Sequence, residues 1–157
     1  MNPAHTPIGG AAALAFAMLA LTTAFHYEAL RLLERAAAGR SVSQGRAVGF
    51  LITLVAVHLA EVALYAVAYG LGANVFGLGT LGGSSGRAWL DFFYFAAETY
   101  STLGYGDLVP VGALRLLASV EALNGLLLLA WSGAFLFGVL DGGSHRRARS
   151  RTTDKPN

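Results

Sequence analysis

Cysteine is absent from this chain of 157 residues, and charged residues make up only 13% of it. Without cysteine, the chain has neither a disulfide framework nor a thiolate metal site. A typical soluble domain carries about 25% charged residues, whereas hydrophobic residues here reach 55%. The composition therefore favours a single-domain membrane protein over a soluble protein with a large core.

Long apolar segments take the place of the missing charges. A helix needs about 20 mostly apolar residues to cross a bilayer. Three segments satisfy this: 8–25, which we expect to continue as an amphipathic helix to about residue 35, then 47–69 and 113–140. Segment 88–101 is apolar but too short to cross, as is typical of a re-entrant helix. The sequence predicts an all-α membrane protein with three transmembrane helices, one re-entrant pore helix and a loop after it.

Basic residues predict the orientation of these helices, because Lys and Arg mark the cytoplasmic side. They gather in a linker and a tail, as Arg31, Arg35, Arg40 and Arg46 and as Arg146, Arg147, Arg149, Arg151 and Lys155. Segments 1–10 and 70–86 have none. In a cell (inner or plasma) membrane we expect the N-terminus and 70–112 outside, and the linker 31–46 and the tail 141–157 inside, with the tail disordered from Gly142. A cleaved signal peptide over 1–25 is the alternative, but its basic n-region is missing.

The loop after the short helix reads TLGYGD, residues 102–107. Gly104 and Gly106 can adopt φ > 0 without steric cost. Alternating them with ordinary residues lets successive carbonyls point the same way. Irregular backbone at membrane depth survives only where it is buried in protein or lines water. Four such loops around an axis would stack rings of carbonyl oxygens around a cation, which the C-terminal end of the short helix would also favour.

This loop resembles the selectivity filter of potassium channels, and the resemblance covers about residues 47–140. It implies an outer helix 47–69, outer loop 70–87, pore helix 88–101, filter 102–107 and inner helix 113–140, after an N-terminal unit 1–46. It also implies a passive, potassium-selective homotetramer that is not an enzyme and has no organic cofactor. Nucleic acid is not an expected partner.

By the same resemblance, potassium is bound by the filter, whose residues are Thr102, Leu103, Gly104, Tyr105 and Gly106, with carbonyl ligands from the first four. Glu98 and Asp107 would form a supporting pair. Leu103 replaces the usual Val or Ile, and Tyr94 and Phe95 replace two tryptophans that brace the filter in some bacterial channels. Tyr94 can still donate a hydrogen bond, whereas Phe95 cannot.

Three further ionisable residues, His58, Glu61 and Glu121, lie within the second and third spans. Such groups are expensive in a membrane and are functional candidates. His58 and Glu61 share a helix face at i and i+3, and Glu121 lies at a depth similar to that of Glu61. We expect a hydrogen-bonded network that clamps the helices, with a proton-sensing gate or a metal site as alternatives.

Other features leave alternatives open. Gly125 is a candidate gating hinge or a close-packing residue. The tail arginines Arg146, Arg147 and Arg149 could bind anionic lipid or serve only as the cytoplasmic anchor. The alternative functions are a weakly selective cation channel and a non-conducting membrane sensor or metal-binding protein that uses His58, Glu61 and Glu121.

Overall fold

Three long helices dominate the computed structural model, which describes residues 6–38, 43–83 and 89–153, with side chains over 8–38, 43–83 and 89–140. The elements in chain order are α1 (Thr6–Ala37), α2 (Gln44–Asn74), β1 (Gly79–Gly82), α3 (Trp89–Tyr100), β2 (Val109–Gly112) and α4 (Leu114–Thr153). Three helical segments are long and apolar enough to span a membrane: Ile8–Ala37, Gln44–Asn74 and Leu114–Leu140. This confirms the predicted all-α membrane fold with three spans and one short helix between the last two.

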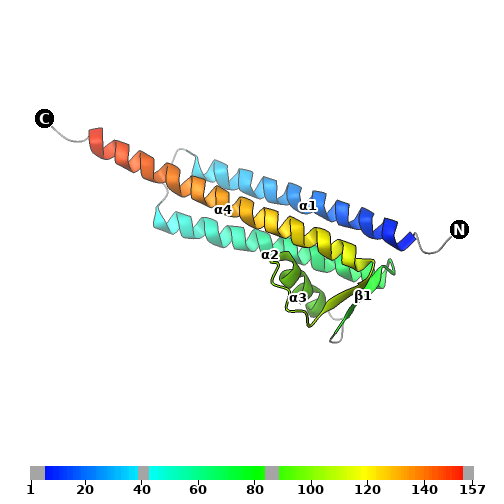
Figure 1. Ribbon diagram of the computed structural model, residues 1–157. Coiled ribbons are helices and arrows are strands. Elements are labelled where there is room, and N and C mark those ends of the chain that lie inside the picture. Colours follow the sequence, from blue (N-terminus) through cyan, green and yellow to red (C-terminus); the bar gives the residue numbers. More distant parts are fainter. Residues whose placement is uncertain (1–5, 39–42, 84–88, 154–157) are drawn as a thin grey trace.

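The three long helices lie side by side as one bundle (Figure 1). α1 and α4 run in the same direction and α2 runs against them. The N-terminal end of α1 lies at the end of the bundle that carries β1, whereas the C-terminal end of α1 and the start of α2 lie at the opposite end (Figure 1). The short helix α3 packs against α2 and α4. The basic linker is therefore separated from the 70–112 region by the length of the bundle.

The segment expected to be an outer loop is more ordered than predicted. α2 continues to Asn74, and β1 pairs with β2 in an antiparallel ribbon in which Gly79 faces Gly112 and Gly82 faces Val109. These strands were not predicted from the sequence, because a short glycine-rich segment shows no alternation of apolar and polar side chains. β1 precedes α3 in the sequence and β2 follows the 102–107 loop, so their pairing joins the two ends of the segment that carries this loop.

The end of α4 also differs from expectation. We expected disorder after about residue 142, but the helix continues to Thr153. A helix that has already begun adds one hydrogen bond for each further residue, so continuing it is easier than starting a new one. The side chains of Arg146, Arg147 and Arg149 lie outside the described part of the chain, as do those of the other basic residues of the tail.

The hydrophobic core has two parts. The larger lies around α3 and includes the fully buried side chains of Tyr65, Tyr69, Leu114 and Leu117, with Ala11 and Ala15 of α1. The smaller lies at the other end of the bundle and consists of Leu30, Leu33, Phe50, Leu54 and Phe135. Because α1 contributes to both, the first span is packed into the pore module along its length rather than being a separate anchor.

Candidate functional site

The loop after α3 has an alternating backbone. Thr102, Gly104 and Gly106 have φ values of 59°, 57° and 80°, whereas Leu103 and Tyr105 between them do not have positive φ. The glycines adopt this conformation freely. Thr102 does not, because a β-branched residue at positive φ is a genuine outlier. Such strain gathers at functional sites, where the surrounding structure holds it in place.

Glu98 of α3 holds this loop through its amides. The backbone carbonyl of Glu98 accepts hydrogen bonds from the Leu103 N–H (2.8 Å) and the Gly104 N–H (3.2 Å). Its side-chain Oε2 accepts a third from the Tyr105 N–H at 3.0 Å. Three successive amides are thus satisfied on the α3 side of the loop. Among the described residues, no hydrogen bond involves the carbonyls of 102–106, which are left for another partner.

Asp107 is held by Tyr94 rather than by Glu98. The Tyr94 hydroxyl donates to Oδ1 of Asp107 at 3.3 Å. The Tyr94 ring also stacks on that of Tyr105, with centroids 6.3 Å apart and planes 4° from parallel. Within the described chain, no direct hydrogen bond joins Glu98 to Asp107. The two carboxyls therefore contact the 102–107 loop at separate points. The Tyr94 hydroxyl holds Asp107 in place.

The electrostatics at Glu98 follow from its position. Burial raises the pKa of the Glu98 carboxyl, and the negative charge of Asp107 raises it further, while the hydrogen bond from the Tyr105 N–H opposes both. The net direction is upward. Glu98 therefore takes up a proton more readily than an exposed glutamate.

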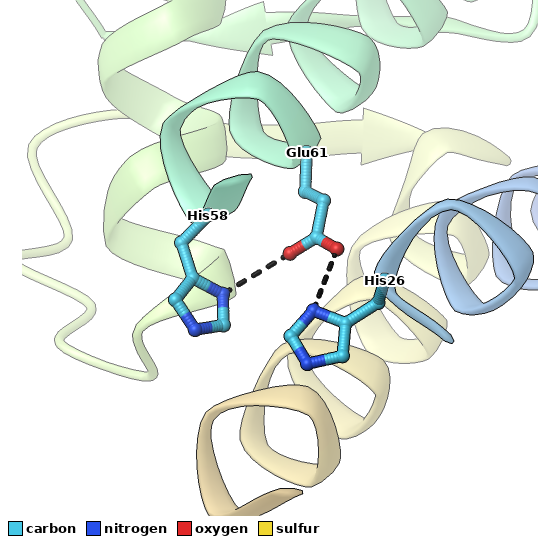
Figure 2. Close-up of side chains that lie close together, drawn as sticks. All are labelled: His26, His58 and Glu61. Carbon is cyan, nitrogen blue, oxygen red and sulfur yellow. Dashed lines mark hydrogen bonds and ion pairs between the residues drawn. The ribbon is translucent and has the colours of Figure 1, made fainter. Parts of the chain in front are cut away.

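Two of the three predicted network residues, His58 and Glu61, meet in the bundle. His26, which was not predicted from the sequence, joins them. Nδ1 of His58 lies 3.1 Å from Oε2 of Glu61, and Nδ1 of His26 in α1 lies 3.0 Å from Oε1 (Figure 2). His26 and Glu61 are fully buried, and the His58 side chain is 14% exposed. The carboxylate of Glu61 thus joins α1 to α2.

Ser132 of α4 closes this arrangement into a ring. Its Oγ lies 3.0 Å from Nε2 of His58 and 3.3 Å from Nε2 of His26. Each imidazole therefore has one nitrogen toward Glu61 and the other toward Ser132. We call these four residues, His26, His58, Glu61 and Ser132, the polar ring. It joins α1, α2 and α4 in the interior of the bundle.

The polar ring also contacts the pore helix. The hydroxyl of Tyr100, the last residue of α3, donates to Oε2 of Glu61 and lies 2.9 Å from Nδ1 of His58. Burial raises the pKa of the Tyr100 hydroxyl, and its hydrogen bond to Glu61 raises it further. The hydroxyl therefore keeps its hydrogen. Tyr100 is separated from Thr102 by one residue, so the ring is tied to the start of the filter.

Each of His26, His58 and Glu61 has one possible metal-ligand atom, an imidazole nitrogen or a carboxylate oxygen. These atoms lie within 4.8 Å of one another, close enough to hold a metal ion. Yet each of these atoms already has a hydrogen-bond partner inside the bundle. Hydrogen bonding alone accounts for the arrangement, and we describe it as a hydrogen-bonded ring.

Glu121 lies apart from the polar ring. Its Oε2 accepts a hydrogen bond from the hydroxyl of Tyr69, and its Oε1 has no partner within the described chain. No hydrogen bond joins it to His58 or Glu61 among the described residues. The three-residue network expected from the sequence is thus divided into a Glu61 part and a Glu121 part.

Asn124 forms a second link between the helices. Its Nδ2 donates to Thr22 Oγ1 at 2.6 Å and to the Tyr65 hydroxyl at 3.0 Å, and its Oδ1 accepts from Thr23 Oγ1 at 3.3 Å. A signal for the residues on α1 was present, since Thr22 and His26 lie on one helix face at i and i+4. It was missed because the first span was counted only to residue 25.

The fold and loop define a membrane protein with a re-entrant helix and a backbone-lined loop between two spans, which is the class of pore-loop channels. Residues 52–141, more than half of the chain, match a protein family described as ion channel. The chain belongs to this family and carries a potassium-channel pore module. The family is one of channels and not of enzymes.

Curated relatives agree with this membership. Over 89 residues the chain is 33% identical to the inward rectifier potassium channel Kirbac3.1 of Paramagnetospirillum magnetotacticum, covering 56% of this chain and 28% of the relative. It is 37% identical over 62 residues to the uncharacterized membrane protein YdjJ of Bacillus subtilis, covering 39% and 18%. It is 45% identical over 49 residues to the voltage-gated potassium channel Kch of Escherichia coli, covering 31% and 12%. The chain thus matches less than a third of each relative, and no solved structure matches it.

Proposed function

We propose that four copies of this chain form a potassium-selective channel whose filter is the segment 102–106. The observation that carries the proposal is the alternating backbone, with positive φ at Thr102, Gly104 and Gly106. Glu98 takes up the amides of three consecutive residues on the α3 side. The carbonyls remain available, and rings of backbone carbonyls are what replace the hydration shell of potassium in a filter.

The geometry of one copy supports assembly from several copies. A single loop can line only one side of a path for ions. The side chains of Leu103 and Tyr105 are also exposed in the single chain, by 57% and 67%. A large aromatic and a leucine beside a filter are expected to be covered by neighbouring copies. A homotetramer around the filter axis would cover these side chains and complete the carbonyl rings.

The ion ligands in this proposal are the carbonyls of Thr102, Leu103, Gly104 and Tyr105, and no organic cofactor takes part. The filter would open outward in the cell membrane, with the N-terminus and the β1–β2 ribbon outside and both basic segments in the cytoplasm. The bundle supports this orientation, because the N-terminal end of α1 and the ribbon lie at one end and the C-terminal end of α1 and the start of α2 at the other (Figure 1). Anionic lipid at the tail arginines is a further part of the proposal.

The test is potassium flux through purified protein in liposomes, compared with sodium flux, for the natural chain and two variants. Gly104→Ala places a side chain at φ 57° in the filter, and Gly77→Ala places one at φ 61° in the loop before β1. Neither added Cβ would meet an atom within 4 Å in the single chain, so the two substitutions carry similar backbone strain, about 1–2 kcal/mol. We expect potassium-selective flux that Gly104→Ala abolishes and Gly77→Ala preserves.

Other outcomes would favour the rival functions. Equal fluxes of sodium and potassium would support a weakly selective cation channel. A verified tetramer that passes no ions over a range of pH and lipid would point to a non-conducting sensor. Loss of flux in both glycine variants would show that strain in general, rather than strain in the filter, was being measured.

A further inference from the structure

The polar ring imposes a strict count of hydrogens. Both Nε2 atoms face the Ser132 Oγ, whose hydroxyl has one hydrogen to donate. One Nε2 can therefore accept, and the other must donate. Both Nδ1 atoms face the carboxylate of Glu61, so both must donate if that group is ionised. All four contacts are then made only if one imidazole is neutral and the other is an imidazolium.

The number of hydrogens is the same if Glu61, rather than an imidazole, carries the extra one. A protonated Glu61 can donate to one Nδ1, and two neutral imidazoles then complete the ring through Ser132. In both arrangements Glu61, His26 and His58 share three acidic hydrogens and have no net charge. With one hydrogen fewer, both Nε2 atoms compete for the single Ser132 hydrogen, or an Nδ1 faces the carboxylate without one. One bond of the ring must then be lost.

We propose that the polar ring is a proton-binding site that links α1 and α2 to α4 beside the filter. While Tyr100 donates to Glu61, the cheapest bond to lose without the bound proton is one of the two on Ser132, since both Nδ1 atoms then face an anionic acceptor. α4 then loses its Ser132 bond to α1 or to α2. The filter is close by, because Tyr100 donates to Glu61 and its backbone carbonyl lies against Gly125 of α4.

The titratable groups that surround the ring are not the source of the exchangeable proton. Tyr100 of α3 keeps its hydrogen, and Tyr65 of α2 is engaged with Asn124. Glu121 of α4 is bonded to Tyr69 rather than to any ring member. The ring of His26 in α1 also lies beside that of Trp131 in α4, with centroids 5.7 Å apart. The Trp131 side chain does not titrate. The exchangeable proton is thus held by the ring itself, on His26, His58 or Glu61.

The binding half of the proposal can be tested without measuring conduction. Nitrogen NMR of the imidazoles and carbon NMR of the Glu61 carboxyl follow the full-length protein in lipid nanodiscs between about pH 5 and 8, with His5 and His145 replaced by glutamine. We expect His26, His58 and Glu61 to lose one proton between them in a single coupled step. Ser132→Ala removes both the acceptor for one Nε2–H and the donor to the other Nε2, and it should displace the step. Ser119→Ala, an exposed serine of the same helix, should not move it.

The coupling half, which rests on the proposed channel function, uses two readouts of the filter. The amide signal of Gly104 and the potassium flux are followed over the same pH range, and both should change at the midpoint of the coupled step and move with it in Ser132→Ala. Two neutral imidazoles together with an ionised Glu61 carboxylate at every pH, or a stoichiometric metal ion on the purified protein, would overturn the proton site. A Gly104 signal that ignores the coupled step would overturn the coupling. Absence of flux at every pH would instead count against the channel function, while the NMR results still decide the proton site.

Discussion

Gly125 of α4 lies directly against the backbone carbonyl of Tyr100, the residue that ends the pore helix. A Cβ at position 125 would lie 2.2 Å from the Tyr100 oxygen and 2.9 Å from its carbonyl carbon. Neither atom can move cheaply, because both belong to the backbone. Gly125 therefore allows α4 to approach the start of the filter. This supports the close-packing role over the hinge, which stays a prediction.

We expect Gly125→Ala to destabilise the folded protein by about 1–3 kcal/mol, the usual cost of forcing an atom into a packed site, and, under the proposed function, to lower potassium flux. Thermal unfolding in detergent and liposome flux check the two effects. Gly133→Ala is the matched control on the same helix, since nothing lies within 4 Å of its added Cβ. If Gly125→Ala altered gating but left the unfolding temperature unchanged, the residue would act as a hinge rather than as a contact.

Asn124 is expected to be a main attachment of the first span to the pore module. Asn124→Ala removes three hydrogen bonds to Thr22, Thr23 and Tyr65. Interhelical hydrogen bonds in membranes average about 0.6 kcal/mol each, so we expect a loss of roughly 2 kcal/mol. Asn74→Ala is the control, because Asn74 is exposed and bonds only to the carbonyl of Gly70 in its own helix. Equal unfolding free energies for the two variants would contradict the attachment.

Glu61 and Glu121 are both fully buried carboxyls, yet they should respond differently to the same substitution. Glu61 accepts from Tyr100 and faces two imidazoles, so an amide in Glu61→Gln turns one acceptor into a donor. Glu121 has a single partner, and Glu121→Gln keeps an acceptor for Tyr69. We expect Glu61→Gln to cost about 1–3 kcal/mol and Glu121→Gln well under half of that. Similar costs, measured by chemical unfolding of the purified protein, would show that the number of hydrogen bonds does not decide the role of these residues.

Hydropathy and glycine spacing predicted what depends on local properties. The three spans follow from their length and composition, and positive φ at Gly104 and Gly106 follows from the absence of a side chain. Positive φ at Thr102 could not be predicted in this way, because a threonine does not favour it locally. The conformation of the loop is instead held by Glu98, which accepts hydrogen bonds from the N–H groups of residues 103–105.

The polar contacts were harder to predict because they depend on how the helices are rotated and shifted against one another. His58 and Glu61 share a helix, so their spacing was enough to bring them together. Glu121 was expected at the same depth as Glu61, but depth alone does not say which face points inward, and its hydrogen bond is to Tyr69. His26 and Ser132 enter the ring from two other helices, which only the packed bundle reveals.

The carboxyl of Glu98 should make the stability of the filter depend on pH. Burial raises its pKa in the folded chain. An acid whose pKa is higher in the folded than in the unfolded state lowers the stability above the folded pKa, and this cost disappears as the pH falls below the unfolded value. The free energy of unfolding should therefore rise as the pH falls through this range. Glu98→Gln stays neutral and keeps an oxygen to accept from the Tyr105 N–H, so the variant protein should unfold with a weaker pH dependence. Unfolding of both proteins between about pH 4 and 7 tests this, and a pH dependence that is the same in Glu98→Gln would assign it to another group.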